Sequence, residues 1–387
     1  MVPTADVLNN ISEARVVQLL ERLVSFPTVN PPGDEEMIAR FIAEILEKIG
    51  CRVQLQYVSE RRPNVIALFG EGDKRLVFNT HMDVVPVSAW NHGDPFNPVI
   101  KDGKVYGRGT ADAKGSLAAM IAALEAINTV SVSLSGEIAI TAVVDEEGAS
   151  RGAKKLFRDF RGNFGIVAEP TGLTPVIAHR GTLRLVITTK GKSAHSSMPE
   201  KGVNAIYQMI PVIQAIEDLH ARLSGRRHRL CGSPTATVTK IVGGEKENIV
   251  PDQCEIIVDR RLIPGETMES ALDEIRIVIE ECKKHYNIDV WIEDLIETTG
   301  GPAEIEETAD IARIACQAVH EVTGRKPKVG GLLATCDMVH LVSAGIPTVV
   351  LGPGDITLAH TADEHIDIRE LHQAAKVYAL IIMSTLM

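Results

Sequence analysis

The first part of the chain alternates segments of helical and strand-like periodicity. Residues 34–49 place apolar side chains three and four positions apart, and Gly50 follows as a stop signal, so this pattern predicts a helix. Apolar runs predict strands at 52–57, 63–69, 75–80, 137–144 and 164–169, and a buried helix at 115–127. Strands that alternate with helices are typical of an α/β sheet covered on both faces.

The pattern changes after about residue 178. Strands are expected at 182–191, 235–244 and 253–261, with helices near 202–220 and 266–285. This β-α-β-β-α-β-like order indicates a separate α+β unit of ferredoxin-like type. The α/β pattern then resumes with a helix at 308–323, a strand within 345–352 and a last helix at 368–385. We therefore expect a mixed-sheet α/β domain over 1–178 and 294–387, interrupted by an inserted α+β domain over 179–293.

Composition narrows the class of protein. The chain has 387 residues, of which 45% are hydrophobic and 24% charged, which excludes a mainly disordered chain. Its net charge of −11 disfavours nucleic acid as a partner, because like charges repel. The N-terminus lacks the charged and apolar regions of a signal peptide, and no apolar run is long enough for a membrane span. Six cysteines without a C-x-x-C pair fit reduced thiols. We expect a cytoplasmic protein with no membrane partner.

Acidic and histidine residues recur where expected strands end. In open α/β sheets, ligands bind beyond the carboxyl ends of the strands, so these side chains are expected to converge on one crevice. The set comprises His81 and Asp83; Asp112; Asp145, Glu146 and Glu147; Glu169; and His360, Asp363, Glu364 and His365.

This residue chemistry favours a metal site. Carboxylates packed together repel one another unless a cation neutralises them, and imidazole with carboxylate suits zinc or a similar divalent ion. The candidates outnumber the ligands that one zinc needs, which favours two metals about 3.5–4 Å apart. Asp112, in a Gly-rich loop before a helix, is placed to bridge them.

Two further roles follow from local spacing. Asp83 lies two residues after His81 and is expected to orient the metal-bound imidazole. Of the adjacent Glu146 and Glu147, one would ligate metal and the other would act as general base. Each residue also has an ordinary alternative, such as a solvated acidic turn, a histidine at a strand end or, for Asp112, a turn former.

Motifs in these segments carry a resemblance to a known family. They are NTHMDVVP, YGRGTADAKG, DEEG, AEPT, GKSAHSSMPEKGVNAI and AHTADEH, in family order. The chain resembles, over almost its whole length, the zinc metallohydrolase family of acetylornithine deacetylase and succinyl-diaminopimelate desuccinylase, which includes aminoacylase and glutamate carboxypeptidase. The resemblance implies a dinuclear-zinc exopeptidase-like catalytic domain with an inserted lid or dimerisation domain.

The resemblance also implies roles for the candidate metal residues. His81 and Glu169 would bind one metal, Glu147 and His360 the other, and Asp112 would bridge them. Asp83 would clamp the His81 imidazole, Glu146 would be the general base, and His365 is a rival of His360. Glu169 is typical of deacylases and carboxypeptidases, whereas the aminotripeptidase branch tends to use Asp at this position.

In the inserted domain the resemblance implies substrate contacts. His195 would help to stabilise the tetrahedral oxyanion, in many relatives from the partner subunit of a dimer. Asn248 and Arg260 match substrate-contacting positions, and Arg260 has the chemistry to bind a carboxylate with two hydrogen bonds. Arg261 is easily confused with Arg260. Thr335 follows a Gly-rich stretch that resembles the substrate loop, but GLLATCDMVHL departs from the expected pattern.

Together these features predict a cytoplasmic, homodimeric amidohydrolase of amino-acid biosynthesis. It would remove an acyl group from an N-acyl amino acid with a water activated by two divalent metals, expected to be zinc, with cobalt possible. The alternatives are a dipeptidase or glutamate-type carboxypeptidase of the same family, and a non-catalytic metal-binding homologue.

Overall fold

The chain folds into two units. A computed structural model describes residues 4–387, so the first three residues of the expected range 1–178 lie outside the described residues. Unit 1 runs to Ile177 and resumes over Glu304–Gly331 and Cys336–Met387, whereas unit 2 comprises Ala178–Ala303 and Leu332–Thr335. Unit 2 thus extends ten residues beyond the expected end at 293, a position that falls inside its last strand, Asp289–Ile296.

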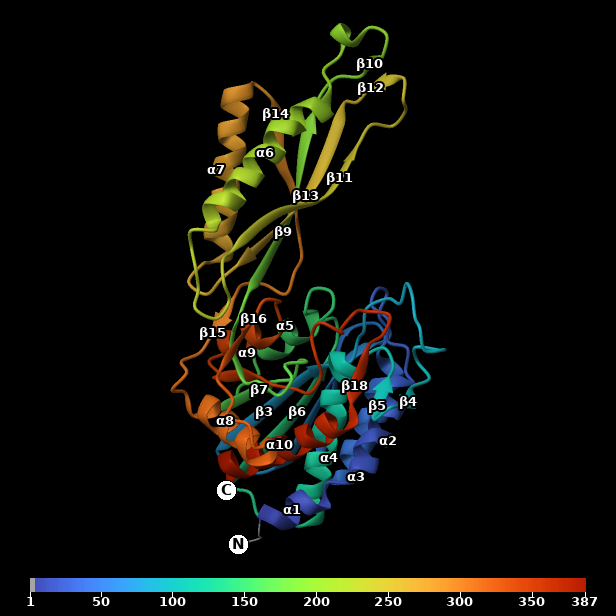
Figure 1. The fold of residues 1–387 in the computed structure, drawn as a ribbon, viewed down its shortest axis with the longest axis vertical. Coiled ribbons are helices and arrows are strands. Elements are labelled where there is room, and N and C mark those ends of the chain that lie inside the picture. The colour runs from blue at the N-terminus through green and yellow to red at the C-terminus, as the bar shows by residue number, and fades with distance from the viewer. Residues whose placement is uncertain (1–3) are drawn as a thin grey trace. The chain divides into compact units, whose positions relative to one another are not determined.

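A large mixed sheet forms the centre of unit 1 (Figure 1). Its strands follow in the order β1 (Arg52–Ser59), β2 (Arg62–Gly70), β6 (Gly136–Val143), β3 (Lys74–His81), β7 (Phe164–Val167), β17 (Thr348–Val350), β8 (Val176–His179) and β15 (Ala303–Glu304), with β16 (Gly330–Leu332) pairing β8. β6, β3, β7 and β17 are neighbours and run parallel. Every residue of β6 is buried, as the continuous apolar run predicts for a central strand.

Helices pack around this sheet. They are α1 (Thr4–Asn10), α2 (Glu13–Val24), α3 (Glu36–Ile49), α4 (Gly115–Thr129), α5 (Arg151–Phe157), α8 (Asp310–Thr323), α9 (Met338–Ser343) and α10 (Ile368–Leu386), with α1 and α2 packing on the sheet by way of α4 and α10. In α3 the predicted apolar stripe is buried at Ile38, Ile42 and Leu46, and Gly50 ends the helix with a φ of 103°. α4 and α10 pack against each other and against β3, which explains why α4 is apolar on all sides.

A small sheet and a short helical turn order the loops of unit 1. A small sheet has the order β18 (His365–Asp367), β5 (Lys104–Tyr106) and β4 (Val99–Lys101). The turn η1 (Thr110–Lys114) leads directly into α4. Because β18 pairs with β5 just before η1, the small sheet brings together segments that are about 260 residues apart in sequence.

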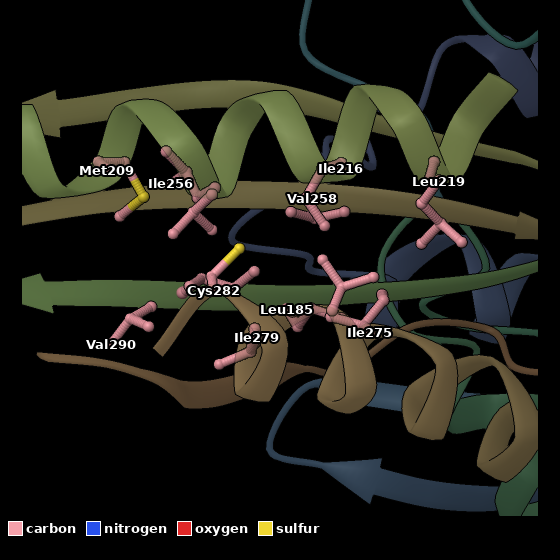
Figure 2. Close-up of a cluster of buried hydrophobic side chains, with 14 of the residues drawn as sticks. Leu185, Met209, Ile216, Leu219, Ile256, Val258, Ile275, Ile279, Cys282 and Val290 are labelled. Carbon is pink, nitrogen blue, oxygen red and sulfur yellow. The ribbon is translucent and has the colours of Figure 1, made fainter. Parts of the chain in front are cut away.

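Unit 2 contains the expected ferredoxin-like arrangement. Along the chain it has β9 (Gly181–Lys190), α6 (Ala205–Leu223), β11 (Thr235–Gly243), β13 (Gln253–Leu262), α7 (Met268–Tyr286) and β14 (Asp289–Ile296), and the antiparallel sheet has the order β11-β13-β9-β14. Figure 2 shows apolar side chains such as Leu185, Ile216 and Ile275 packed between the two helices and the sheet. A two-stranded ribbon, β10 (Ala194–His195) with β12 (Ile249–Val250), and the short helix η2 (Pro199–Lys201) complete the unit. The α/β fold class with an inserted α+β unit is thereby confirmed.

No helix among residues 4–387 combines the length and the apolar character that a membrane crossing requires.

Candidate metal centre

Three parallel strands of unit 1 carry candidate ligands at the same edge of the sheet. His81 is the last residue of β3, Glu147 lies in the turn after β6, and Glu169 follows β7. β3 pairs in parallel with both β6 and β7, so the carboxyl ends of the three strands meet (Figure 1). This is the convergence expected from the spacing of polar residues at strand ends.

The first cluster consists of His81, Asp112 and Glu169, whose ligand atoms all lie within 4.8 Å of one another. The His81 side chain is fully buried, and its Nε2 lies 3.0 Å from Oδ1 of Asp112. Nδ1 of His81 lies 2.9 Å from the backbone carbonyl of Asp83, an acceptor that fixes the proton on Nδ1 and leaves Nε2 free to ligate.

The second cluster consists of Asp112, Glu147 and His360, again with ligand atoms within 4.8 Å. Nε2 of His360 lies 3.1 Å from Oε1 of Glu147 and 3.2 Å from Oδ2 of Asp112. Asp112 therefore presents one oxygen to His81 and the other to His360. A carboxylate that bridges two metals requires this arrangement.

The donor set fits a pair of divalent cations. Burial, reinforced by the charge of Asp112, raises the pKa of Glu169 well above its ordinary value, which reflects the cost of crowding carboxylates away from water. Burial also opposes ionisation of Asp112, yet its hydrogen bonds to His360 and His81 hold its pKa below the ordinary value. Bound cations would relieve the repulsion, and imidazole nitrogen with carboxylate oxygen is the donor chemistry of zinc and related metals.

Asp83 connects the first cluster to the turn that follows β6. Its carboxylate lies 3.7 Å from Nδ1 of His81, too far for a hydrogen bond, so the backbone carbonyl rather than the carboxylate receives the imidazole proton. The carboxylate instead accepts hydrogen bonds from the backbone N–H groups of Glu146 and Glu147, both at 3.2 Å. The Asp83 carboxylate therefore does not orient the His81 imidazole as expected; the Asp83 backbone carbonyl does, while the carboxylate anchors the turn at Glu146 and Glu147, a contact that the sequence spacing did not reveal.

Glu146 lies beside the metal clusters but belongs to neither of them. Burial raises its pKa well above the ordinary value, and the neighbouring charge of Glu169 adds to this shift. A carboxylate that ligates no metal and is easily protonated has the properties of a proton carrier. Between the two adjacent glutamates, the geometry groups Glu147 with His360 and leaves Glu146 apart.

His365, the rival of His360, lies outside both clusters. Its Nδ1 faces the backbone carbonyl of Asp363 at 2.7 Å, and its ring packs on Tyr106 with centroids 4.8 Å apart. The ring therefore belongs to the small sheet, which disfavours a role as metal ligand.

In unit 2 the ribbon brings His195 and Asn248 together. His195 pairs with Ile249 in the β10–β12 ribbon, and the backbone N–H of Ser196 donates to the carbonyl of Asn248 at 3.0 Å. Both residues are exposed, and Nδ1 of His195 is hydrogen-bonded to Ser197 Oγ at 2.7 Å. This bond fixes the ring so that Nε2 is the nitrogen available to a substrate.

Arg260 is not accessible to a substrate, contrary to the expectation from the sequence. Its side chain is 0% exposed, and Nη2 donates to Glu266 at 2.8 Å and to Glu274 at 3.1 Å. The prediction that Arg260 contacts substrate is therefore corrected to a buried ion-pair role. The signal was present in the sequence, because Arg260 shares the period-two face of β13 with Ile256 and Val258, which is the core face.

Arg261, which the sequence leaves easily confused with Arg260, lies on the opposite face of β13. Its Nη1 donates to Thr182 Oγ1 at 2.9 Å, and Thr182 Oγ1 lies 2.6 Å from Thr335 Oγ1. The predicted Thr335 therefore belongs to a polar group with Arg261 and Thr182, of which Thr182 was not singled out. Arg261 is also held by Asp259, with Nε to Oδ1 at 2.7 Å, so its guanidinium is fixed in orientation.

Comparison with known proteins identifies the family. Residues 77–384 match the family described as Peptidase family M20/M25/M40. The chain belongs to this family. It is 33% identical over 372 residues to acetylornithine deacetylase of Proteus mirabilis, an alignment that covers 92% of this chain and 93% of that protein.

Solved structures share this fold. Aminopeptidase PepT from Bacillus cereus superposes with a TM-score of 0.79 at 25% identity, covering 97% of this chain and 99% of that one. A Bacillus subtilis protein described as a dinuclear metal binding peptidase of the M20 family superposes with a TM-score of 0.71 at 17% identity, covering 96% and 98%. The protein is a metal-dependent M20-family hydrolase that acts on amide bonds, with a centre for two divalent metals.

Proposed function

We propose that the protein removes the acyl group from an N-acyl amino acid, in the manner of acetylornithine deacetylase. The observation that carries the proposal is a pair of ligand clusters that share Asp112, with Glu146 beside them but outside both. Similarity to acetylornithine deacetylase over nine-tenths of both chains favours this substrate class. Glu169, the residue that the resemblance associates with deacylases and carboxypeptidases, points the same way.

The proposed roles follow from the contacts. Divalent metals bound there, which we expect to be zinc, would supply Lewis-acid chemistry for activating a water and a substrate carbonyl. His81, Glu169, Glu147 and His360 would hold them, and Asp112, which belongs to both clusters, would contribute to both positions. Glu146 takes the proton of the attacking water and returns it to the leaving amine. His195 donates a hydrogen bond to the developing oxyanion, and a donor of this kind contributes about 3 kcal/mol.

We assign the substrate carboxylate to Arg261 instead of Arg260. Arg261 combines a fixed guanidinium with partial exposure, its side chain being 28% accessible. Thr182 and Thr335 supply hydroxyl groups next to it. Asn248, beside His195 on the ribbon, remains a proposed substrate contact.

Product analysis on two substrate panels tests the proposal. The purified protein, loaded with zinc or cobalt, is incubated with N-acetyl, N-succinyl and N-formyl amino acids and, separately, with dipeptides. Release of carboxylic acid and free amino acid from the first panel is expected. Hydrolysis of dipeptides alone would exclude the deacylase and establish the peptidase.

A peptidase is the second candidate, and the structural similarity to an aminopeptidase is the observation that favours it. A non-catalytic metal-binding protein is disfavoured, because Glu146 retains the position and burial suited to a proton carrier.

We also propose that the protein is a homodimer that assembles through unit 2. Large apolar side chains are exposed on α6, β11 and β12, and β11 is an edge strand. They are Tyr207, Ile210, Ile241, Val242 and Ile249, with exposures of 39–71%. Sedimentation should show a dimer that Ile241→Lys dissociates, whereas the control Ile277→Lys, at an exposed site on α7, leaves it intact. A monomeric native protein would refute this assembly.

The six cysteines are free in the structure, and we propose a reducing, cytoplasmic location on that basis.

A further inference from the structure

Glu364 is a buried carboxylate with an unusual set of partners. Its Oε1 accepts hydrogen bonds from the backbone N–H groups of Gly109 at 2.9 Å, Ala111 at 3.1 Å and Asp112 at 3.2 Å. Its Oε2 accepts a hydrogen bond from Nη1 of Arg108 at 2.5 Å. The side chain is 0% exposed, so water cannot replace these bonds.

These contacts tie together the two loops that carry ligands. Glu364 lies four residues after His360 in the loop that leads into β18, and its carboxylate closes the turn that presents Asp112. The backbone supports the same junction, because the N–H of Gly107 donates to the carbonyl of Glu364 at 3.2 Å. One side chain thus sets the position of the Asp112 backbone relative to the segment of His360.

We propose that Glu364 is a positioning residue that sets the affinity of both metal positions by holding Asp112 between His81 and His360. The inference rests on the proposed two-metal function. Asp112 is the only member common to both clusters found among residues 4–387. A shift of its backbone would therefore weaken both positions together, whereas loss of a ligand such as His360 weakens one cluster directly. Groups that orient metal ligands typically change metal affinity 10–100-fold when they are removed.

Arg108 makes the arrangement sensitive to charge. Its side chain is 3% exposed, its Nη1 binds Glu364, and its guanidinium lies 5.8 Å from the centre of the Trp90 ring. Replacing the carboxylate by an amide leaves this buried cation without an anion and turns an amide N–H toward either Arg108 or the backbone donors. Glu364→Gln therefore disrupts the turn with almost no change in side-chain volume.

Metal binding by the folded protein tests the inference. Metal-free wild type, Glu364→Gln and the control Asp363→Asn are titrated with Co²⁺ and Zn²⁺ in competition with a chromophoric chelator. Asp363 is the adjacent carboxylate, but its side chain is 56% exposed and it bonds to Asn91 and His92. We expect roughly 10–100-fold weaker binding at both positions in Glu364→Gln and a changed Co²⁺ absorption spectrum, with Asp363→Asn like wild type.

The outcomes separate the possible failures. Wild-type affinity at both positions in folded Glu364→Gln would overturn the positioning role, as would a loss of stability without a loss of affinity. If Glu364→Gln does not fold, Glu364→Asp keeps the charge for Arg108 but shortens the reach to the backbone donors, and the same loss of affinity is expected. A wild-type protein that binds fewer than two metals would overturn the proposed function and this inference with it.

Discussion

Adjacent arginines of β13 provide a matched test of the substrate assignment. Arg260→Met and Arg261→Met remove the same charge from neighbouring positions on opposite faces of one strand. We expect Arg261→Met to impair catalysis with little loss of stability. Arg260→Met should instead destabilise unit 2 and leave substrate recognition intact in the folded molecules.

The ion pairs of Arg260 and Arg261 set the expected loss of stability in each variant. Arg260→Met leaves Glu266 and Glu274 without their buried partner, and breaking a buried ion pair costs about 3–5 kcal/mol. Arg226 still pairs with both glutamates, so the lower limit of about 3 kcal/mol is expected. Asp259 likewise keeps Arg184 at 2.8 Å when Arg261 is replaced, which limits that loss to about 1 kcal/mol.

The catalytic loss follows from the bond that Arg261 would make. A hydrogen bond to a charged group contributes about 1.5–3 kcal/mol, so kcat/KM should fall roughly 10- to 150-fold in Arg261→Met. This loss is expected for an N-acetyl amino acid but not for its carboxamide analogue, which lacks the anion.

Two measurements are needed. The kcat/KM values come from release of the free amino group, measured for the acid and the amide substrate. Unfolding of unit 2 is followed in urea by the fluorescence of Trp291 in β14, with Trp90 replaced by Phe in every variant. An equal loss of kcat/KM on both substrates in Arg261→Met would refute the carboxylate assignment. So would a selective loss on the acid substrate in a stably folded Arg260→Met.

Further predictions concern the metal centre and His195. Glu146→Gln should lower kcat by about 10²–10⁴-fold or more while elemental analysis still finds two metals per chain, and an active variant would reject the general-base role. A strong chelator should abolish activity, and added Zn²⁺ or Co²⁺ should restore it. Hydrogen bonds to Asp112 and Glu147 raise the pKa of His360 to about 10 in the metal-free protein, so a metal must displace a proton from His360 and the apparent metal affinity should rise with pH. A metal affinity that stays constant over about three pH units, between pH 6 and 9, would contradict this linkage. If His195 acts across the dimer, mixed dimers of His195→Ala and Glu146→Gln should regain part of the activity, and inactive heterodimers would place its action within one chain.

The fold was predictable wherever one strong pattern acted alone. The stripe at 34–49 became α3, and the apolar run at 137–144 became the buried strand β6, because each must bury its apolar face whatever its neighbours are. β14 gave no such pattern, since its DVWIEDLI sequence is rich in acidic residues and only one side chain is buried. Pairing with β9 makes it a strand, and the expected boundary at residue 293 falls inside it.

The candidate ligands show the same division. Their residue types and their places at strand ends were visible in the sequence, and the parallel order of β6, β3 and β7 brings them to one edge. The sequence did not reveal that Asp83 accepts a hydrogen bond from the backbone of Glu146 or that Glu364 accepts one from the backbone of Asp112. These bonds join residues that are 63 and 252 positions apart.

Local periodicity and residue chemistry by themselves determined the α/β frame, the ferredoxin-like insertion and a group of candidate metal ligands. Only the tertiary structure decided which glutamate joins His360, which backbone groups hold Asp112 and which arginine of β13 is fully buried in an ion pair while its neighbour stays partly exposed. The physical reason is that periodicity reports burial along one segment, whereas a hydrogen-bond partner depends on distances between segments that the chain brings together only when it folds.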